Sequence, residues 1–418
     1  MRIVYIHQYY KNRSSPGSTR SFEFAKRLVQ DGHDVEVVTT GEATGNETRG
    51  WSTDVDEGIL VHRVRVPYAN NMSYARRIVA FVHFSVLASI RAARLRPDLV
   101  FATSTPLTVA IPGVLAARLH RVPFVFEVRD LWPELPIELG ALRNPLARWA
   151  AFRLARTAYR NASEVVALSP GMVDGVVSHG YPREHVTLIP NGSDIELFGS
   201  QETPAREFRS SRPWLGTRPL VVYAGHVSTA NGVDYLVRLA AAVRQRSPEV
   251  RFLVVGYGRD VPAVTEQARD AGLLDESFFL MDRLPKAEMP AVLGAATVAT
   301  SLFLPLPGLR DNSPNKVFDA LAAGRPVVIN YGGWQADLLE TSGAGLTLPY
   351  DDVEAAADLL VAALADQEWL CSAGAAARAL AEQRFSREKQ YEQLVQVLQA
   401  AASPTRHPAR HQLTARAG

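Results

Sequence analysis

Short apolar runs alternate with amphipathic segments along most of this chain. The run Arg2–His7 is rich in β-branched residues, as buried parallel strands are. In the segment Ser18–Asp31 apolar residues recur at helical spacing, Gly32 ends the helix, and the next apolar run is Val35–Thr39. A strand, a helix and a strand within about 40 residues form a β-α-β unit, whose crossover is right-handed almost by rule.

The same pattern continues and then restarts at Pro219. We predict further strands at Leu99–Thr103, Pro123–Glu127, Glu164–Leu168, Val186–Ile189, Leu220–Gly225, Arg251–Gly256, Phe278–Met281, Thr297–Leu302 and Pro326–Ile329. Helices are predicted between them, including Tyr235–Ser247, Val261–Ala271 and one near Pro314–Ala323. A polar run after Pro190 separates the halves, so we expect α/β domains at 1–200 and 201–400. The segment 403–418 has no periodicity and is expected to be a disordered tail.

Composition narrows the class of protein. Of the 418 residues, 47% are hydrophobic and 21% are charged, which is usual for a soluble globular protein and excludes a collagen or a multi-span membrane protein. The single cysteine, Cys371, excludes a disulfide scaffold and a cysteine-rich zinc site. A formal net charge of +2 is too balanced for a dedicated nucleic-acid binder. No signal peptide precedes the first strand, so we expect a cytoplasmic protein.

The segment RDNSPNKVFDALAAGRPVV, which begins at Arg310, contains the strongest candidate site. Ser313 suits the N-cap of a helix, Pro314 its first position, and Gly324 the position that follows its end. The N-terminus of such a helix carries free N–H groups and a partial positive charge, so it can bind an anion. Lys316 in the first turn opposes the helix dipole, which favours selection for phosphate binding. A surface helix with solvated charges is the alternative.

Two acids accompany this lysine. Asp319 lies three residues after Lys316 and shares its helix face, and Asp311 precedes Asp319 by eight positions. One carboxylate is therefore expected on the loop before the helix and the other on the helix itself.

PNKVFDALAAGRPVV, together with GSTRSFEFAKRLVQDGHDVEVVTT, FEVRDLWPE and IPNGSD, resembles the retaining glycosyltransferases of family 4 over roughly residues 1–400. The likeness is closest to a branch that includes predicted N-acetylfucosamine and related UDP-sugar transferases of surface polysaccharide synthesis. The resemblance implies the GT-B architecture, an α/β fold of two doubly wound, Rossmann-like domains that face across a cleft. The first domain would bind the acceptor and the second the nucleotide-sugar donor.

The hallmark of this family is a pair of glutamates eight positions apart, and Asp311 and Asp319 occupy those positions here. The resemblance implies that Asp311 lies near the donor sugar and that Asp319 binds the ribose hydroxyls. It also implies that Gly17 and Ser18 lie near the distal phosphate of the donor. Arg20, one turn into the first helix, is expected to meet the acceptor or a phosphate.

The family has an arginine and a later lysine on the donor diphosphate, and this chain has His226 and Asn231 instead. Lys316 is therefore expected to carry more of the phosphate binding, with Arg283 as a helper. Asn191-Gly192 resembles the segment between the family's domains and is interpreted as a hinge. The predicted donor-binding residues are Gly17, Ser18, Gly225, His226, Asn231, Arg283, Ser313, Asn315, Lys316 and Asp319.

FEVRDLWPE ends a predicted strand in charged residues, at the edge of the sheet where ligands bind. We expect Asp130 to steer the acceptor hydroxyl or accept its proton, and Arg129 to stabilise phosphate; a structural ion pair is the alternative. The predicted catalytic residues are Asp130, Asp311 and Lys316, and the predicted acceptor-binding residues are Arg20 and Arg129.

Two other motifs carry little weight. Gly256-Tyr257-Gly258 lacks the third glycine of a dinucleotide-binding loop, because Val261 occupies that position. Asp54-Val55-Asp56 matches the metal motif of the other major glycosyltransferase fold, but no strand is predicted directly before it, and we interpret the match as chance. No metal is expected to be required, because Lys316, a helix N-terminus and backbone amides can stabilise a diphosphate.

The segment Tyr74–Arg94 is predicted to be a helix that is apolar over most of its circumference. Arg76, Arg77, Arg91 and Arg94 flank about 14 mainly apolar residues, which are too few to span a bilayer. Such a helix either packs in the core of the first domain or docks on an anionic membrane surface, and the sequence leaves both open.

Together these patterns predict a retaining glycosyltransferase of the hexosyl or N-acetylhexosaminyl type, with a UDP-sugar as co-substrate and no cofactor. The acceptor is expected to be a hydroxyl group, on a lipid-linked or natural-product glycan precursor, and the location the cytoplasm or the inner face of the plasma membrane. A sugar-nucleotide 2-epimerase of the same fold and a non-catalytic sugar-nucleotide-binding protein are the alternatives. The sequence does not identify the sugar, the acceptor or the oligomeric state.

Overall fold

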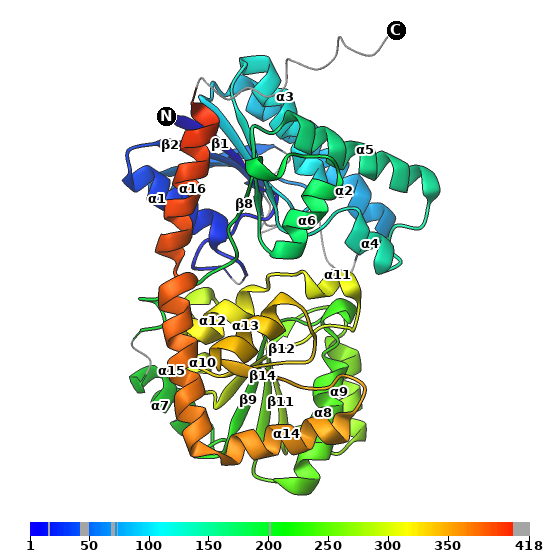
Figure 1. Ribbon diagram of the computed structural model, residues 1–418, viewed down its shortest axis with the longest axis vertical. Helices are drawn as coiled ribbons and strands as arrows, with labels where there is room; N and C mark the ends of the chain where they lie inside the picture. The colour runs from blue at the N-terminus through cyan, green and yellow to red at the C-terminus, as the bar shows by residue number, and fades with distance from the viewer. Residues whose placement is uncertain (16, 42–49, 68–71, 73, 200–201, 404–418) are drawn as a thin grey trace. The chain divides into compact units, whose positions relative to one another are not determined.

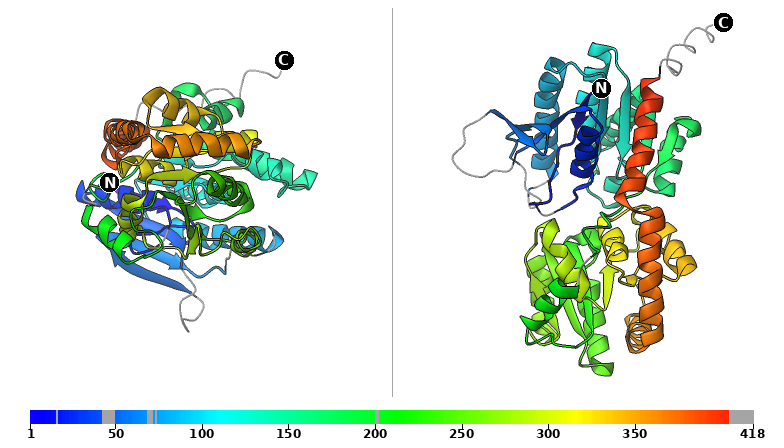
Figure 2. Two further views of the ribbon diagram at one scale, coloured as in Figure 1. Left: turned by 90° about the horizontal axis from the view of Figure 1, so that it is seen from below. Right: turned by 90° about the vertical axis from the view of Figure 1, so that its left-hand side faces the viewer.

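A computed structural model of the protein describes residues 1–15, 17–41, 50–67, 72, 74–199 and 202–403. The chain forms two compact units: the first holds Met1–Asn12, Thr19–Pro190 and the chain from Tyr391, and the second holds Arg13–Ser18 and Asn191–Gln390. Each unit is built around its own largely parallel sheet with helices on both faces (Figures 1 and 2). The predicted fold class, two doubly wound α/β units, is confirmed.

The sheet of the first unit has the strand order β3-β4-β2-β1-β5-β6-β7-β8, parallel except for the β3–β4 pair. Its strands are β1 (Arg2–Ile6), β2 (Asp34–Thr40), β3 (Trp51–Asp56), β4 (Ile59–Val64), β5 (Leu99–Thr103), β6 (Phe124–Val128), β7 (Glu164–Ala167) and β8 (Val186–Leu188). Its helices are α1 (Arg20–Gln30), α2 (Tyr74–Arg94), α3 (Ala110–His120), α4 (Glu134–Glu138), α5 (Pro145–Asn161), α6 (Pro170–Ser178) and most of α16 (Arg387–Ala402).

The sheet of the second unit has the order β11-β10-β9-β12-β13-β14. Its strands are β9 (Leu220–His226), β10 (Arg251–Tyr257), β11 (Phe278–Met281), β12 (Val298–Ser301), β13 (Val327–Ile329) and β14 (Gly345–Thr347). Its helices are α7 (Glu202–Ser210), α8 (Asp234–Arg246), α9 (Val261–Asp270), α10 (Met289–Ala295), α11 (Pro307–Arg310), α12 (Asn315–Ala322), α13 (Trp334–Ser342), α14 (Val353–Ala365) and α15 (Gln367–Arg384).

Burial on both faces explains why the central strands are continuous apolar runs. Every residue of β5 and β6 is buried, and so is every residue of β12 and β13. Right-handed crossovers place α2, α3 and α5 on one face of the first sheet, because the chain advances in the same direction across the sheet each time. Helix α1 takes the other face, where Phe24 packs beside Tyr391 of α16.

The structure differs from the sequence-based prediction in the boundary between the units and in three strands. The units divide at Pro190 and not at residue 200, and α16 returns to the first unit from Tyr391. The strands β3, β4 and β14 were not predicted. β3 is an exposed edge strand of mixed polarity without an apolar run, and β14 has only three residues, Gly345–Thr347. The predicted tail, from residue 404 on, lies outside the described residues.

Candidate functional site

A cavity of about 310 Å³ opens at the carboxyl ends of the second unit's strands. Parallel sheets bind ligands at that edge. Its charged and polar lining residues are Ser18, His226, Tyr257, Arg283, Lys286, Thr300, Asn315, Lys316 and Asp319, and its apolar wall includes Val222, Val255, Leu284, Met289 and Leu293. The lining combines three cations with one carboxylate, so the cavity suits an anionic ligand.

Lys316 lies in the first turn of α12, as predicted, and its side chain lines this cavity. Its Nζ donates hydrogen bonds to Tyr223 Oη at 2.9 Å and to Asn231 Oδ1 at 3.0 Å, and lies 4.3 Å from the centroid of the Tyr223 ring. None of these partners is a carboxylate. Burial lowers the pKa of Lys316 to about 7, so a bound anion would restore a fully charged ammonium group.

Gly225 makes room for this lysine. A Cβ atom at residue 225 would lie 3.0 Å from Lys316 Cε and 3.2 Å from its Nζ. Gly256 is required for a different reason, since a Cβ there would lie 1.9 Å from the carbonyl oxygen of Gly225 on the neighbouring strand. The second glycine therefore serves close packing of β9 and β10, in agreement with the rejection of a dinucleotide-binding loop.

Asp319 also lines the cavity, one turn along α12 from Lys316. Its Oδ2 accepts a charge-assisted hydrogen bond from Lys286 Nζ, and its Oδ1 accepts one from Ser193 Oγ at 2.9 Å. Sequence reasoning missed Lys286 and Ser193. One signal was available for the former in the sequence: only five of the 45 basic residues are lysines. The structure shows that two of these five line the cavity.

The start of α12 differs from the prediction. The helix begins at Asn315 with Pro314 as its N-cap residue, and no side chain caps it. The hydroxyl of Ser313 instead accepts a hydrogen bond from the backbone N–H of Asn191, whose side-chain amide donates to the Ser313 carbonyl oxygen. Asn191 is thus a buried support of the α12 N-terminus, and Gln390 of α16 donates to its carbonyl oxygen.

The cavity brings together most of the predicted donor-binding residues. The lining includes Gly17, Ser18, Gly225, His226, Arg283, Asn315, Lys316 and Asp319, while Asn231 reaches the site through its hydrogen bond with Lys316. Residues 13–18 belong to the second unit. Asp311, at the end of α11, is not among the described residues that line the cavity.

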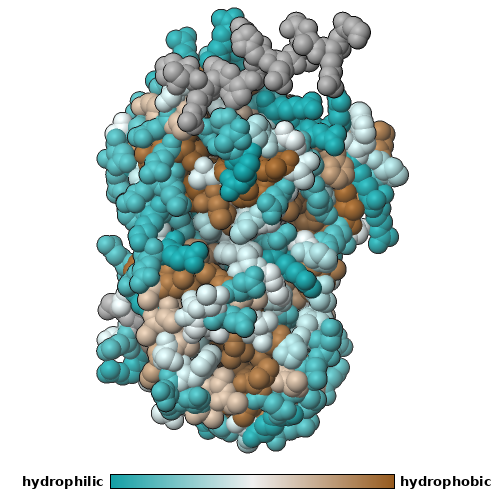
Figure 3. Space-filling view, in the orientation of Figure 1, coloured by the Kyte–Doolittle hydropathy of each residue, from teal (hydrophilic) through white to brown (hydrophobic). Residues whose placement is uncertain are grey.

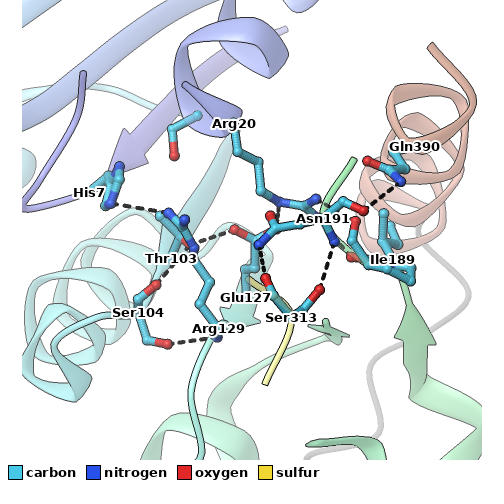
Figure 4. Close-up of polar contacts among 12 residues, drawn as sticks. His7, Arg20, Thr103, Ser104, Glu127, Arg129, Ile189, Asn191, Ser313 and Gln390 are labelled. Atoms are coloured by element: carbon cyan, nitrogen blue, oxygen red, sulfur yellow. Dashed lines mark hydrogen bonds and ion pairs between the residues drawn. The ribbon is translucent and has the colours of Figure 1, made fainter. Parts of the chain in front are cut away.

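The prediction that Arg20 binds the acceptor or a phosphate requires a correction, because this residue has a structural role. Its side chain is fully buried in the first unit, where its guanidinium pairs with Glu127 at 2.9 Å. It also donates to the carbonyl oxygens of Ile189 and Pro190 (Figure 4). Thr103 Oγ1 donates to the second Glu127 oxygen. Arg20 therefore ties α1 to the ends of β6 and β8.

Arg129 and Asp130 follow β6 and lie beside this network. The backbone N–H of Arg129 donates to Ser104 Oγ at 2.9 Å, and its guanidinium lies 3.4 Å from His7 Nε2 (Figure 4). Burial, reinforced by Arg129, lowers the pKa of His7 well below its usual value. Burial raises the pKa of Asp130, against the hydrogen bond from Thr105. A carboxyl group with a raised pKa is suited to accept a proton.

The acids of the rejected metal motif lie on β3. Asp56 accepts a hydrogen bond from Asn12, and Asp54 pairs with Arg63 at 3.4 Å. The described residues contain no cluster of His, Cys, Asp and Glu that could hold a metal ion. In the same part of the chain, no helix is both long and apolar enough to cross a membrane.

Comparison with known proteins gives two family matches, one in each half of the chain. Residues 17–192 match the glycosyl transferase 4-like domain, and residues 218–366 match the glycosyl transferases group 1. Both matches are to glycosyltransferase domains.

Curated relatives and a solved structure extend these matches. A GDP-mannose-dependent alpha-mannosyltransferase of Mycobacterium tuberculosis (strain CDC 1551 / Oshkosh) is 25% identical over 355 residues, which is 85% of this chain and 85% of the relative. A GDP-mannose-dependent alpha-(1-6)-phosphatidylinositol monomannoside mannosyltransferase of Mycolicibacterium smegmatis is 26% identical over 297 residues, 65% of this chain and 77% of the relative. The structure of Anabaena HepE in complex with UDP-glucose covers 96% of this chain and 100% of its own, with a TM-score of 0.73 at 19% identity.

Proposed function

Because this chain is a family 4 glycosyltransferase with the GT-B fold, we propose that it transfers a sugar from a UDP-sugar to a hydroxyl acceptor, with retention at the anomeric carbon. The observation that carries the proposal is Lys316, a lysine held in the cavity without a carboxylate partner among the contacts that surround it. A diphosphate would supply the missing negative charge. The branch resemblance favours UDP as the nucleotide.

In the proposed reaction the bond between the anomeric carbon and the diphosphate oxygen breaks, and the acceptor oxygen bonds to the same face of that carbon. Negative charge grows on the departing diphosphate. Lys316 and the N-terminal amides of α12 stabilise that charge, and this stabilisation requires no metal. Asp319 holds the ribose, and Asp311 acts near the donor sugar.

We assign the acceptor to the first unit. Asp130, whose pKa is raised by burial, accepts the proton that the acceptor hydroxyl loses. The neighbouring residue Arg129 binds the acceptor. The products are then the glycoside, free UDP and a proton. A glycan precursor with a free hydroxyl is the class of acceptor that this chemistry requires.

A thermal-shift screen of UDP-, GDP- and dTDP-sugars tests the donor assignment. A ligand that binds only the folded protein raises its unfolding temperature, so UDP-sugars should give the largest shift. The shift should disappear in Lys316→Ala. A larger shift with GDP-sugars would show that the donor carries GDP and not UDP. No shift with any sugar nucleotide would contradict the proposed function.

A second part of the proposal concerns the membrane. Helix α2 buries Ala80, Phe84 and Ala88 in the core, so it is a core helix. The same helix exposes an apolar stripe of Ile78, Val79, Val82, Val86 and Ile90. Apolar side chains also interrupt the hydrophilic surface of the first unit in the space-filling view (Figure 3). The two predicted placements of this helix are therefore not exclusive.

Two further helices, α3 and α5, also expose apolar side chains. Helix α3, which packs on α2, exposes Leu115 and Leu119, and α5 exposes Leu146 and Trp149. The three helices contain nine arginines and no Asp or Glu. Apolar side chains with a surrounding excess of arginine suit an anionic lipid surface, where tryptophan favours the interfacial region. We therefore propose that this face docks on the cytoplasmic surface of a membrane.

Co-sedimentation with vesicles containing phosphatidylglycerol tests this docking. Arg91 is unsuitable for the test because its guanidinium bonds His62 and Thr53 inside the unit. The variant Arg76→Gln/Arg94→Gln/Arg118→Gln should release the protein at low salt, and so should Trp149→Ser. The matched control is Arg238→Gln/Arg259→Gln/Arg269→Gln in the second unit, which should bind like the wild type. If the wild type does not bind, the docking proposal is wrong.

A further inference from the structure

Lys286 is a second lysine of the cavity, and the proposed phosphate binding by Lys316 leaves it without a role. It begins a single 3-10 turn, Lys286–Glu288, between β11 and α10, and is only 7% exposed. The chain has forty arginines and five lysines. Arginine is therefore its usual basic residue, and a lysine inside a cavity is an exception.

The Lys286 ammonium group is directed at Asp319. Nζ donates to Asp319 Oδ2 and lies 5.3 Å from the ring centroid of Phe198, which is 1% exposed. From the other side, Ser193 Oγ donates to Asp319 Oδ1 at 2.9 Å. The carboxylate is thus held at both oxygens, and 13% of its side chain remains exposed.

This arrangement leaves acceptor capacity at both oxygens of Asp319. An ionised carboxylate offers about four lone-pair sites, two on each oxygen. Lys286 and Ser193 use one site each, so each oxygen retains one for a further donor. Two adjacent acceptors match two vicinal hydroxyl groups, which is the arrangement of the 2′- and 3′-hydroxyls of ribose.

We infer that Lys286 is a positioning residue that, with Ser193, holds Asp319 so that its two oxygens receive the ribose hydroxyls of the donor. The inference rests on the proposed function, which assigns the ribose to Asp319. It explains how an aspartate can serve where the family pattern has a longer glutamate, because its two neighbours fix the carboxylate. It also makes the Lys286–Asp319 pair a determinant of the preference for ribose over deoxyribose.

Isothermal titration of the full chain with UDP, 2′-deoxy-UDP and inorganic pyrophosphate tests this inference. The wild type should bind UDP about tenfold or more tightly than 2′-deoxy-UDP, because the lost hydroxyl donates to a charged acceptor. In Lys286→Met this ratio should fall to that of Asp319→Asn, while the affinity for pyrophosphate stays unchanged. Lys286→Arg keeps the charge and should keep part of the ratio, and Ser193→Ala should lower it severalfold.

The control is Lys389→Met, which removes an exposed lysine of the same unit and should leave every affinity unchanged. If Lys286→Met does not fold, Ser193→Ala and Lys286→Arg still decide the outcome. A lost pyrophosphate affinity with an unchanged ribose preference would overturn the positioning role and make Lys286 a phosphate ligand. A wild type that binds UDP and 2′-deoxy-UDP equally would instead overturn the ribose assignment within the proposed function.

Discussion

The ammonium group of Lys316, on α12, donates a 3.0 Å hydrogen bond to the side-chain oxygen of Asn231, in the loop after β9. Asn231 occupies the position where the family pattern has a diphosphate-binding lysine. The ammonium group of Lys316 therefore lies beside the position to which the resemblance assigns a lysine, and α12 supplies it. In the proposed function this arrangement lets the cavity receive a diphosphate, although His226 and Asn231 stand where the resemblance implies two cations.

Replacement of Lys316 and replacement of Asp319 should change the kinetics of the enzyme in different ways. Lys316 meets charge that grows as the glycosidic bond breaks, so Lys316→Ala should lower kcat by about 10²–10³-fold. Asp319 meets ribose hydroxyls that do not change during the reaction, so Asp319→Asn should raise the donor KM and affect kcat less. Steady-state kinetics with varied donor distinguish the two. Near-normal turnover in a folded Lys316→Ala protein would contradict the phosphate assignment.

Donor affinity should fall as the pH rises above neutrality. The pKa of Lys316 in the free protein is about 7, and a bound diphosphate favours its protonated form. Above that pH binding must take up a proton, so the dissociation constant should rise about tenfold per pH unit. A UDP-sugar has no phosphate that titrates in this range. Lys316→Arg, which stays charged, should flatten the profile, and an unchanged slope in that variant would show that another group titrates.

The space above Gly225 gives a milder way to disturb Lys316. Gly225→Ala adds a methyl group 3.0 Å from Lys316 Cε, and the flexible end of the lysine must move away. We expect a folded enzyme with kcat lowered between about tenfold and a hundredfold, because small displacements of a catalytic group are costly. Gly256→Ala is the contrast, since its methyl group would meet a backbone oxygen, and it should lower the Tm. Equal effects of the two variants on Tm would contradict this distinction.

Arg20 should matter for stability, not for the acceptor. Arg20→Met leaves the Glu127 carboxylate buried without its main partner, and loss of one member of a buried pair costs about 3–5 kcal/mol. Arg20→Met/Glu127→Gln should recover part of that loss. Thermal unfolding measures both. A stable Arg20→Met protein with a raised acceptor KM would instead support the sequence-based prediction that Arg20 binds the acceptor.

The same pair should contribute to acid sensitivity. Burial alone would raise the pKa of Glu127, but Arg20, Arg129 and the hydrogen bonds from Thr103 and Arg20 together hold this pKa below its usual value. A carboxyl group with a lowered pKa stabilises the fold above its unfolded pKa, and this contribution is lost as the pH falls through the folded value. Glu127→Gln should therefore unfold at a temperature that depends less on pH in the acid range. Identical acid profiles would contradict this assignment.

The sequence predicted those elements whose own residues carry a clear pattern of apolar positions. Leu99–Thr103, Phe278–Met281 and Tyr74–Arg94 match β5, β11 and α2 residue for residue. The polar edge strand β3 has no such pattern, because its stability comes from pairing with β4.

The candidate site shows the same limit. Lys316 and Asp319 were predictable together, because a single helix turn joins them. Lys286 lies 33 residues from Asp319 in the sequence, and Arg20 lies 107 residues from Glu127. Only the tertiary structure shows that the first of these cations belongs to the cavity and that the second does not.

The C-terminal helix α16 has a consequence for how the protein is made. Leu394 and Leu398 are at most 1% exposed and belong to the core that begins with Ile3 and Val4. A ribosome delivers these leucines only after the whole second unit has been synthesised. The first unit therefore cannot complete its core until α16 is made, while the second unit can already fold, which reverses the usual order of co-translational folding. A fragment that stops at Pro190 would expose this part of its core and invite aggregation.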